Sequence, residues 1–453
     1  MSESPSPSTR RFVEHALLAS LALSGCARLT SGLPAASTVA AAPTLGAPAP
    51  SQSPSGSLAV AYIEDGNLLV WNQASGETRT LFDSGDVIRV EPSDDGRVLA
   101  FLRRSVVQRS ETEAYEQSAL WAIDSSGENT RELVSADGLR SLLAASETDS
   151  TNFPDLRWVP GTHRLLFSGW TYLVQAEGES HAVPRGLYLV DAEAPTPTVV
   201  VPADNNIRFA PSPDGKSVAL MSPTGLSFVG VDGTDFRQDV LTYSPVGMPG
   251  PLFPTGVWTE DSSAFVLTGS LEEDPAAGIT FALWRVPVDG SAPRQLATIE
   301  RSHPGSVTFS PDGKFAGHIQ YTDTVPVEIA GWSITPLGDG AGPLAVPRDI
   351  EIGYAGLHWS PDGRAYTAEL AELCPGATQD KEICKSPISD GESAAIQWLD
   401  PTHVLLLTRD PSALFLVTLD PSAATDATSV PIHAWPLEEA VGPESFAAVG
   451  EGA

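Results

Sequence analysis

Basic residues are scarce in this chain of 453 residues. Lys and Arg together number 26 against 57 Asp and Glu, and the formal net charge at pH 7 is −31. Nucleic-acid binding and attachment to anionic lipid through a basic patch both need clustered Lys and Arg, so the composition argues against both. The acidic excess is explained by solubility and self-repulsion, or by a surface built for a cation or a basic partner.

The sequence motifs that usually mark catalysis are absent as well. No Gly-x-Ser-x-Gly nucleophile elbow occurs, and the eight His residues are dispersed without a His-Glu-x-x-His, His-x-His or Cys-x-x-Cys motif. Gly-rich phosphate loops are missing too. We therefore expect no motif-based enzyme, no metal and no cofactor, although distant segments could still assemble a site in three dimensions.

Long apolar runs are also missing, and the short run near the amino terminus has the features of a targeting segment. Arg10 and Arg11 precede an apolar stretch at 16–23, which is too short to cross a bilayer as a helix. The Leu-Ser-Gly-Cys that ends at Cys26 resembles the bacterial lipobox. This resemblance implies a signal peptide over residues 1–25 and a lipid on the Cys26 sulfur; the alternative is an ordinary secretory signal with an incidental Cys.

Residues 26–57 begin with that Cys and continue as a linker of mostly Ala, Pro, Ser, Thr and Gly. The linker carries one charge, at Arg28, and too few large apolar residues to bury a core. We expect residues 58–453 to form the folded domain, extracytoplasmic and tethered by lipid to a bacterial envelope membrane.

Cysteine is rare, with three residues in the whole chain. Cys374 and Cys384 remain once Cys26 is assigned to lipid. A pair so close together in an extracytoplasmic protein predicts a local disulfide, with two free thiols as the alternative. A metal site is disfavoured because no His or third Cys lies nearby.

A short cassette recurs along the chain: an aromatic residue, then Ser-Pro-Asp-Gly, then an apolar run. It is complete at 309–313 and 359–363, and degraded copies contain Pro92, Trp158, Pro211, Trp258 and Trp398. Most intervals between copies are close to fifty residues. A repeat of that size with strand-like content is typical of a β-propeller.

The cassette has the chemistry of a tight turn. Pro presets φ at the first corner, Asp bonds local backbone amides, and Gly takes the left-handed conformation. The aromatic residue before the turn is expected to wedge between adjacent blades. The regular spacing of the Asp residues indicates turn formers, not a catalytic carboxylate cluster.

Each repeat contains four strand-like segments, for example 97–102, 120–123 and 131–134 in one of them. Seven such modules can be counted, and residues 58–84 form an eighth that lacks its first strand. The segment Phe446–Val449 could supply it and so close the ring by pairing the chain ends. We predict an all-β fold, a single β-propeller of four-stranded blades, eight by count, with seven as the alternative.

The cassettes resemble the WD-repeat-like propeller repeat of the TolB family, an aromatic residue followed by Ser-Pro-Asp-Gly-Lys and an apolar strand. The segments 309–315 and 212–218 match it best, and the resemblance covers roughly residues 58–435. It implies a propeller fold and is unspecific for function, since such propellers serve as envelope scaffolds and as domains of peptidases.

Four polar insertions separate the second and third strands of their modules, at 103–118, 169–185, 269–280 and 371–391. Equivalent connections in a propeller emerge on one face, so the insertions should form one rim, where binding commonly resides. The alternative is that they are merely solvated, variable loops. The candidate binding residues are Glu111, Glu113, Tyr115, Glu116, Trp170, Tyr172, Glu177, Glu179, His181, Glu272, Glu273 and Asp274.

These features favour a lipid-anchored binding or scaffolding propeller without catalysis of its own, with an envelope protein or peptide as partner. One alternative is an enzyme, a hydrolase or lyase, with a site at the propeller channel. Another is a purely structural envelope component. An enzyme should show acidic or His side chains with perturbed pKa values converging at the channel.

Overall fold

The computed structural model describes most of residues 58–449, which belong to a unit that spans residues 49–453. Outside the described residues lie 1–57, 109–113, 147–148, 175–179, 203–206, 244–246, 249, 252, 275–277, 303–306, 323–328, 339–343, 346–355, 362, 364, 370–371, 376–392, 410–411, 420–426, 436–441 and 450–453.

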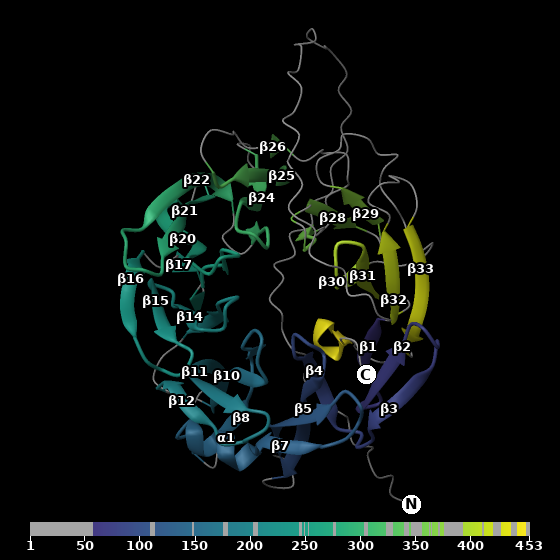
Figure 1. Ribbon diagram of the computed structural model, residues 1–453. Helices are drawn as coiled ribbons and strands as arrows, with labels where there is room; N and C mark the ends of the chain where they lie inside the picture. Colours follow the sequence, from purple (N-terminus) through teal and green to yellow (C-terminus); the bar gives the residue numbers. More distant parts are fainter. Residues whose placement is uncertain are drawn as a thin grey trace, which may run out of the picture. The chain divides into compact units, whose positions relative to one another are not determined.

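Antiparallel sheets follow one another along the chain as propeller blades (Figure 1). Blade 1 contains β34 (Phe446–Val449), β1 (Ala59–Glu64), β2 (Asn67–Asn72) and β3 (Thr78–Phe82). Blade 2 contains β4 (Val87–Pro92), β5 (Val98–Gln108), β6 (Ala114–Asp124) and β7 (Arg131–Val134). Blade 3 contains β8 (Ser150–Asn152), β9 (Leu156–Trp158), β10 (Arg164–Val174), β11 (Ser180–Asp191) and β12 (Thr198–Val201). Blade 4 contains β13 (Arg208–Pro211), β14 (Ser217–Met221), β15 (Gly225–Gly230) and β16 (Arg237–Thr242).

The remaining blades repeat the same order of strands. Blade 5 contains β19 (Gly256–Trp258), β20 (Ala264–Asp274), β21 (Gly278–Pro287) and β22 (Arg294–Ser302). Blade 6 contains β23 (Thr308–Phe309), β24 (Phe315–Tyr321), β25 (Ile329–Pro336) and β26 (Leu344–Ala345). Blade 7 has three described strands, β27 (Gly356–Trp359), β28 (Ala365–Glu369) and β29 (Glu372–Pro375). Blade 8 contains β30 (Ser393–Trp398), β31 (His403–Arg409), β32 (Ser412–Leu419) and β33 (Ala427–Ala434).

The predicted all-β propeller and its count of eight blades are confirmed by these sheets. Blade 3 keeps four strand positions because β8 and β9 pair with different halves of β10. The predicted closure is also confirmed, since β34 pairs with β1 in the register Ala59↔Val449 to Tyr62↔Phe446. Strands from the two ends of the described chain therefore share one sheet.

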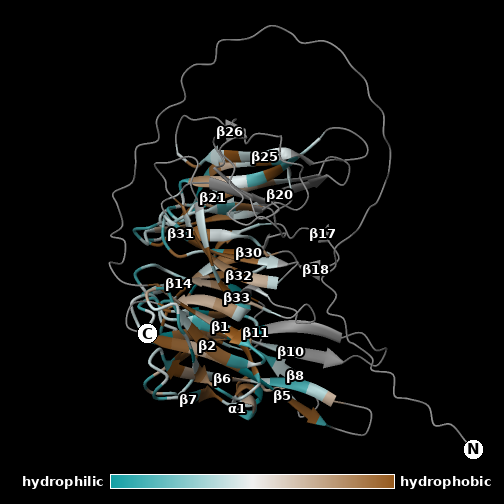
Figure 2. Cartoon of the chain, turned by 90° about the vertical axis from the view of Figure 1, so that its right-hand side faces the viewer, coloured by the Kyte–Doolittle hydropathy of each residue, from teal (hydrophilic) through white to brown (hydrophobic). Residues whose placement is uncertain are grey.

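Apolar residues lie mainly on the strands and hydrophilic residues mainly on the connections between them (Figure 2). Buried clusters join blade 1 to blade 2, and so on around to blade 7. A further cluster joins blade 8 to blade 1. Much of the junction of blades 7 and 8 falls outside the described residues.

Three predicted insertions prove to be extensions of the strands themselves. The second and third strands of blades 2, 3 and 5 run for 10 to 12 residues and pair almost to their tips. The mostly polar residues at 103–118 fit a two-stranded ribbon as well as a loop, so composition alone did not distinguish the two. Two small elements were also missed, α1 (Ala136–Leu142) and the short hairpin of β17 (Gly247–Met248) and β18 (Gly250–Pro251).

The cassette turns have the chemistry expected from the sequence. In blade 4, Ser212 is fully buried, and its hydroxyl donates to Asp214 at 2.6 Å and accepts from the Ser217 amide at 3.0 Å. Gly215 has φ +67°, and a Cβ there would approach the Pro160 carbonyl oxygen of blade 3 to 2.7 Å. The Asp residues of these turns are structural, as predicted.

The aromatic residue before the turn joins neighbouring blades, again as predicted. The Trp158 indole of blade 3 donates to the Glu91 carbonyl of blade 2 at 3.0 Å. The Trp258 indole of blade 5 donates to the Ala210 carbonyl of blade 4 at 2.9 Å. Both acceptors lie two residues before the turn Ser, so the link repeats at equivalent positions.

Candidate functional site

The extended hairpins of blades 2, 3 and 5 form the first candidate surface. Pairing of β5 with β6 continues to Gln108↔Ala114, that of β10 with β11 to Val174↔Ser180, and that of β20 with β21 to Asp274↔Gly278. In blade 4 the same connection closes after Met221↔Leu226. Each hairpin tip lies on the side of its blade opposite the cassette turns, because it joins the second strand to the third.

The structure describes the side chains of only three candidate rim residues. Tyr115 and Trp170 are half-buried, and Glu116 is exposed and forms an ion pair with Arg104 at 3.5 Å. Backbone alone is described for five that lie on strands β10, β11 and β20: Tyr172, His181, Glu272, Glu273 and Asp274. Four lie outside the described residues: Glu111, Glu113, Glu177 and Glu179.

Helix α1 supports the blade 2 hairpin from one side. Ser135 caps it by accepting from the Gly138 amide at 3.0 Å. Its Arg140 lies 2.8 Å from Asp137, donates to Gln117 at 3.2 Å and reaches the Tyr115 hydroxyl at 3.4 Å. One face of the hairpin is therefore held by α1, and Tyr115 is partly covered by it.

A second candidate surface lies on the first strands of the blades, a site that sequence reasoning did not identify. Counted back from the first residue of the cassette turn, the second and fourth residues occupy equivalent positions in every blade, on the first strand or directly before it. In blades 2, 3 and 4 five of these six positions are charged: Arg89, Glu91, Asp155, Arg157 and Arg208. In the other blades the described equivalents are Thr255, Val257, Thr308, Gly356, His358, Ala395, Gln397, Phe446 and Ala448. Alignment of the repeats by their turns would have revealed this asymmetry.

The charges alternate in sign along this inner-strand row. The Glu91 carboxylate lies 3.6 Å from the Arg89 guanidinium and 3.6 Å from that of Arg157. Arg157 also reaches Asp155 at 3.4 Å, and Arg89 donates to the Pro154 carbonyl at 3.1 Å. These ion pairs are longer than normal charged hydrogen bonds, so the carboxylates are held loosely.

Burial perturbs both carboxyl groups of the row. It raises the pKa of Glu91 although Arg89 and Arg157 act against the shift. It likewise raises the pKa of Asp155 against three guanidinium groups, including that of Arg208. In both residues desolvation of the charged form outweighs the nearby positive charge.

A partly enclosed cavity of about 360 Å³ adjoins Glu91. Its walls come from the first strands of blades 8, 1 and 2, and the 3-10 helix η3 (Pro443–Ser445) contacts both β4 and β30 (Figure 1). Its polar side chains are Glu91 and Gln397, and the apolar Val90, Phe446 and Ala447 are almost fully buried beside it. The lining residues are Val90, Glu91, Pro92, Ala395, Ile396, Gln397, Phe446 and Ala447.

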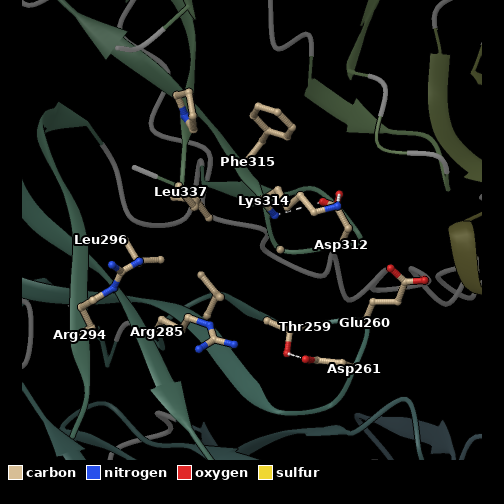
Figure 3. Close-up of a pocket in the computed structure, with 14 residues that line it drawn as sticks. Thr259, Glu260, Asp261, Arg285, Arg294, Leu296, Asp312, Lys314, Phe315 and Leu337 are labelled. Atoms are coloured by element: carbon tan, nitrogen blue, oxygen red, sulfur yellow. Dashed lines mark hydrogen bonds and ion pairs between the residues drawn. The ribbon is translucent and has the colours of Figure 1, made fainter. Parts of the chain in front are cut away.

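On the cassette-turn side, a wider groove of about 840 Å³ separates blades 5 and 6 (Figure 3). Its charged groups include acids that already have partners. Asp261 accepts from Thr259 at 2.7 Å, and Asp312 pairs with Lys314 at 2.9 Å. Two of the carboxylates in the groove are therefore already engaged by neighbouring side chains, which reduces the number of acids that could bind a ligand there.

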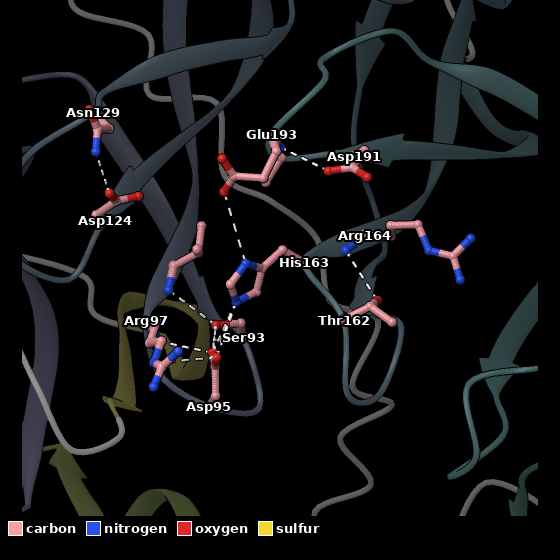
Figure 4. Close-up of polar contacts among 12 residues, drawn as sticks. Ser93, Asp95, Arg97, Asp124, Asn129, Thr162, His163, Arg164, Asp191 and Glu193 are labelled. Carbon is pink, nitrogen blue, oxygen red and sulfur yellow. Dashed lines mark hydrogen bonds and ion pairs between the residues drawn. The ribbon is translucent and has the colours of Figure 1, made fainter.

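At the junction of blades 2 and 3 the cassette-turn side carries a polar network (Figure 4). His163 lies 3.1 Å from Asp95 and 3.9 Å from Glu193. Arg131 continues the network to Glu193 at 3.1 Å and to Asp124 at 3.0 Å. The network links blades 2 and 3, and its charged side chains pair with one another. We therefore assign it a role in stabilising the fold.

Other predicted sites fall largely outside the described residues. Cys26 and Cys384 lie there, and Cys374 is described only as a backbone position in β29 opposite Thr367. Within the described part of the chain, no group of three His, Cys, Asp or Glu residues has an arrangement that could hold a metal ion. No helix described by the structure is long and apolar enough to cross a membrane.

No protein family model matches the chain, and no curated protein matches its sequence. Similar solved structures include an oligogalacturonate lyase in complex with manganese, 14% identical with TM-score 0.44, covering 79% of this chain and 83% of its own. A eukaryotic initiation factor is 12% identical with TM-score 0.47, covering 84% and 98%. TolB from Acinetobacter baumannii is 13% identical with TM-score 0.36, covering 86% and 82%. The fold assignment rests on the strand topology: this chain is an all-β propeller closed by its own carboxyl-terminal strand.

Proposed function

We propose that the protein is a binding module of a bacterial envelope, tethered by lipid on Cys26, which docks an envelope protein or peptide on its hairpin-bearing side. The observation that supports this most is the extension of three hairpins beyond the regular blade. A strand of about five residues is long enough for a blade, as β14 shows. The additional residues of the three hairpins are therefore not needed to form the core.

The blade 2 hairpin has the surface expected of a docking element. Val106 is 62% exposed, on the face that also carries Arg104 and Glu116. The opposite face is supported by α1 through Arg140. An exposed apolar residue flanked by both charges, on a supported ribbon, suits contact with a protein partner.

Site-specific photo-crosslinking in cells tests this proposal. A photoreactive amino acid at Val106 should yield a discrete adduct with a partner, whereas the same residue at Val430, 45% exposed on β33 of blade 8, should not. In a second experiment the photoreactive residue is placed on the blade 3 or blade 5 hairpin, and residues 105–117 are replaced by a two-residue Asn-Gly turn that keeps the Arg104↔Ser118 pair. This replacement should abolish the adduct formed by the second probe. If no hairpin position gives an adduct, the result contradicts the docking proposal and favours a purely structural envelope component.

The anchor is tested separately. Cys26→Ser should move the protein from the membrane fraction to the soluble fraction, because the lipid would have no sulfur to join. Continued membrane retention would contradict lipidation. Alkylation and mass spectrometry before and after reduction should show whether Cys374 and Cys384 are joined.

A second candidate function is an enzyme, a hydrolase or lyase, acting at the inner-strand row. It is favoured by Glu91 and Asp155, since carboxyl groups with raised pKa values suit general acid chemistry. Chromogenic ester and glycoside substrates should be turned over by the wild type and not by Glu91→Gln of unchanged thermal midpoint. Equal turnover by the two proteins, or none by either, would count against it.

A further inference from the structure

An open cavity of about 820 Å³ on the cassette-turn side is lined by residues of blades 3, 4 and 5. Arg164, the first residue of β10, lines it from blade 3. Blade 4 contributes Lys216 of the cassette turn and the connection between β15 and β16, which ends at Phe236. The extended hairpins lie on the opposite side of the blades, so this cavity is separate from the docking surface proposed above.

The Arg164 guanidinium lines this cavity without a charged partner. It is half-buried, and among the residues that the structure describes it forms no hydrogen bond and no ion pair. Its backbone amide donates to Thr162 at 3.2 Å, and Figure 4 shows its side chain directed away from the network around His163. Partial burial of an unpaired charge costs free energy, and a carboxylate that forms a bidentate pair with the guanidinium would offset that cost.

Two further cations line the cavity, and both already have partners. Lys216 lies 3.4 Å from Asp214. Arg237 donates to the Val288 carbonyl of blade 5. Among the described cations of this cavity, Arg164 is therefore the one that is available to an incoming group.

The acids at the cavity limit the negative charge that a ligand can carry. Asp232 accepts from the Thr234 hydroxyl at 2.6 Å and from its amide at 3.1 Å, and it forms no ion pair with Arg164. Asp235 is exposed in the same connection. A ligand with several carboxylates would be repelled by these two groups and by a chain whose net charge is −31. A single carboxylate directed at Arg164 keeps this cost low.

An exposed aromatic side chain lines the same cavity. Phe236 is 52% exposed, one of four large apolar side chains that are exposed in the described part of the chain. Its connection packs on β12 of blade 3, since a Cβ at Gly233, which has φ +86°, would lie 3.6 Å from the Val199 carbonyl oxygen. Val199, 54% exposed, therefore lies beside this connection. Exposed apolar side chains near a guanidinium are typical of protein-binding surfaces.

From these observations we infer that the cavity at blades 3, 4 and 5 binds a peptide segment of a partner protein that carries one carboxylate beside an apolar side chain. The carboxylate pairs with the Arg164 guanidinium, and the apolar side chain covers Phe236. A peptide suits this surface better than a small molecule, because Val199 lies outside the cavity lining and a ligand must extend beyond the cavity to cover both apolar residues.

Three capped peptides test the inference by isothermal titration at neutral pH: acetyl-Ala-Leu-Glu-Phe-Ala-amide and its Gln and Lys counterparts. The Glu peptide should bind saturably at one site, and the other two should bind at least about tenfold more weakly. Because the acidic chain as a whole attracts the Lys peptide, non-specific attraction would give the opposite order. Sodium acetate is the fourth probe, and an acetate affinity equal to that of the Glu peptide would indicate a simple anion site and overturn the inference.

Variants assign the binding to the two side chains. Arg164→Gln should remove the preference for Glu over Gln without lowering the thermal midpoint, because the guanidinium has no described partner to lose. Phe236→Ser, at an exposed position, should weaken the Glu peptide by about tenfold and keeps the inference testable if Arg164→Gln fails to fold. Arg97→Gln and Val430→Ser, at exposed positions of blades 2 and 8, are the matched controls and should leave binding unchanged.

Four results would overturn the inference. They are no saturable binding of the Glu peptide to the wild type, equal binding of the Glu and Gln peptides, a preference for Glu that persists in Arg164→Gln, and unchanged binding by Phe236→Ser.

Discussion

At the scale of single residues, the repeated acidic cassette is structural. The turn Ser is almost completely buried in four blades, at Ser93, Ser212, Ser310 and Ser360. In three of these its hydroxyl donates to the turn Asp at 2.6–2.8 Å and accepts a backbone amide five residues on. In blade 5, Thr259 replaces Ser and keeps both bonds. The chemistry of the turn therefore tolerates Thr but needs the hydroxyl.

Ser212→Ala should lower the free energy of unfolding by about 1–3 kcal/mol, because it leaves the partly buried Ser217 amide without its acceptor. Urea denaturation at neutral pH measures the change. Ser105→Ala, at an exposed position of β5, serves as the control and should change it by less than about 0.5 kcal/mol. Equal effects of the two substitutions would show that the turn hydroxyl is dispensable.

The turn carboxylates should make stability depend on acid pH. Hydrogen bonds from Thr259 and Ser263 lower the pKa of Asp261 to about 2. Because this value lies below the unfolded value of about 3.9, the stabilisation is present above that pH and is lost as the pH falls toward 2. Asp261→Asn should therefore show a smaller drop in urea midpoint between pH 5 and about 2.5 than the wild type. Identical drops would contradict the assignment.

At the scale of elements, arginines from the outermost strands link neighbouring blades. Arg79 donates to the Ser126 carbonyl of blade 2 at 3.0 Å. Arg131 of blade 2 donates to the Ala192 carbonyl of blade 3, and Arg237 of blade 4 to the Val288 carbonyl of blade 5. Each acceptor belongs to the turn after the third strand of the next blade. Guanidinium suits this role because its fixed fork can reach a carbonyl and a carboxylate together.

Arg131→Lys should lower the free energy of unfolding by about 1–2 kcal/mol, since an ammonium cannot reach Ala192, Asp124 and Glu193 together. The urea midpoint measures this loss. Arg97→Lys is a matched control, because that side chain is exposed and its ion pair with Asp95 spans 3.8 Å. An equally large loss of stability in Arg97→Lys would show that the change from guanidinium to ammonium lowers stability whatever the contacts of the side chain.

At the scale of the whole propeller domain, closure depends on one short strand. β34 completes blade 1, and Phe446, Ala447 and Val449 are all buried there. The same segment walls the cavity beside Glu91. Without β34, the edge of β1 would be left unpaired and its apolar side chains would be uncovered.

A chain ending at residue 441 should therefore have a lower thermal midpoint and form oligomers in size-exclusion chromatography. The truncation leaves the edge of β1 unpaired and removes the buried Phe446. Replacing a buried Phe by Ala already lowers the free energy of unfolding by about 3–5 kcal/mol. A chain ending at residue 449, which keeps β34, is the control. Monomeric behaviour of the shorter chain with an unchanged midpoint would show that closure is not required.

Local patterns in the sequence were sufficient to predict the repeat, the turns, the wedging Trp residues and the closing strand, because each depends on residues near one another in the chain or on a fixed period. The limits of β7 follow from the same patterns, since the structure has this strand at the predicted residues 131–134. The limits of β5 and β6 do not, since a polar ribbon held by α1 has the same composition as a loop. Only the tertiary structure placed Arg89, Glu91, Asp155, Arg157 and Arg208 on one row, and Glu91 beside Gln397 and Phe446. Alignment of the turns identifies these positions as equivalent, but it does not say that their side chains meet. The packing of first strands from different blades brings them into contact, and the sequence near each residue does not encode that packing.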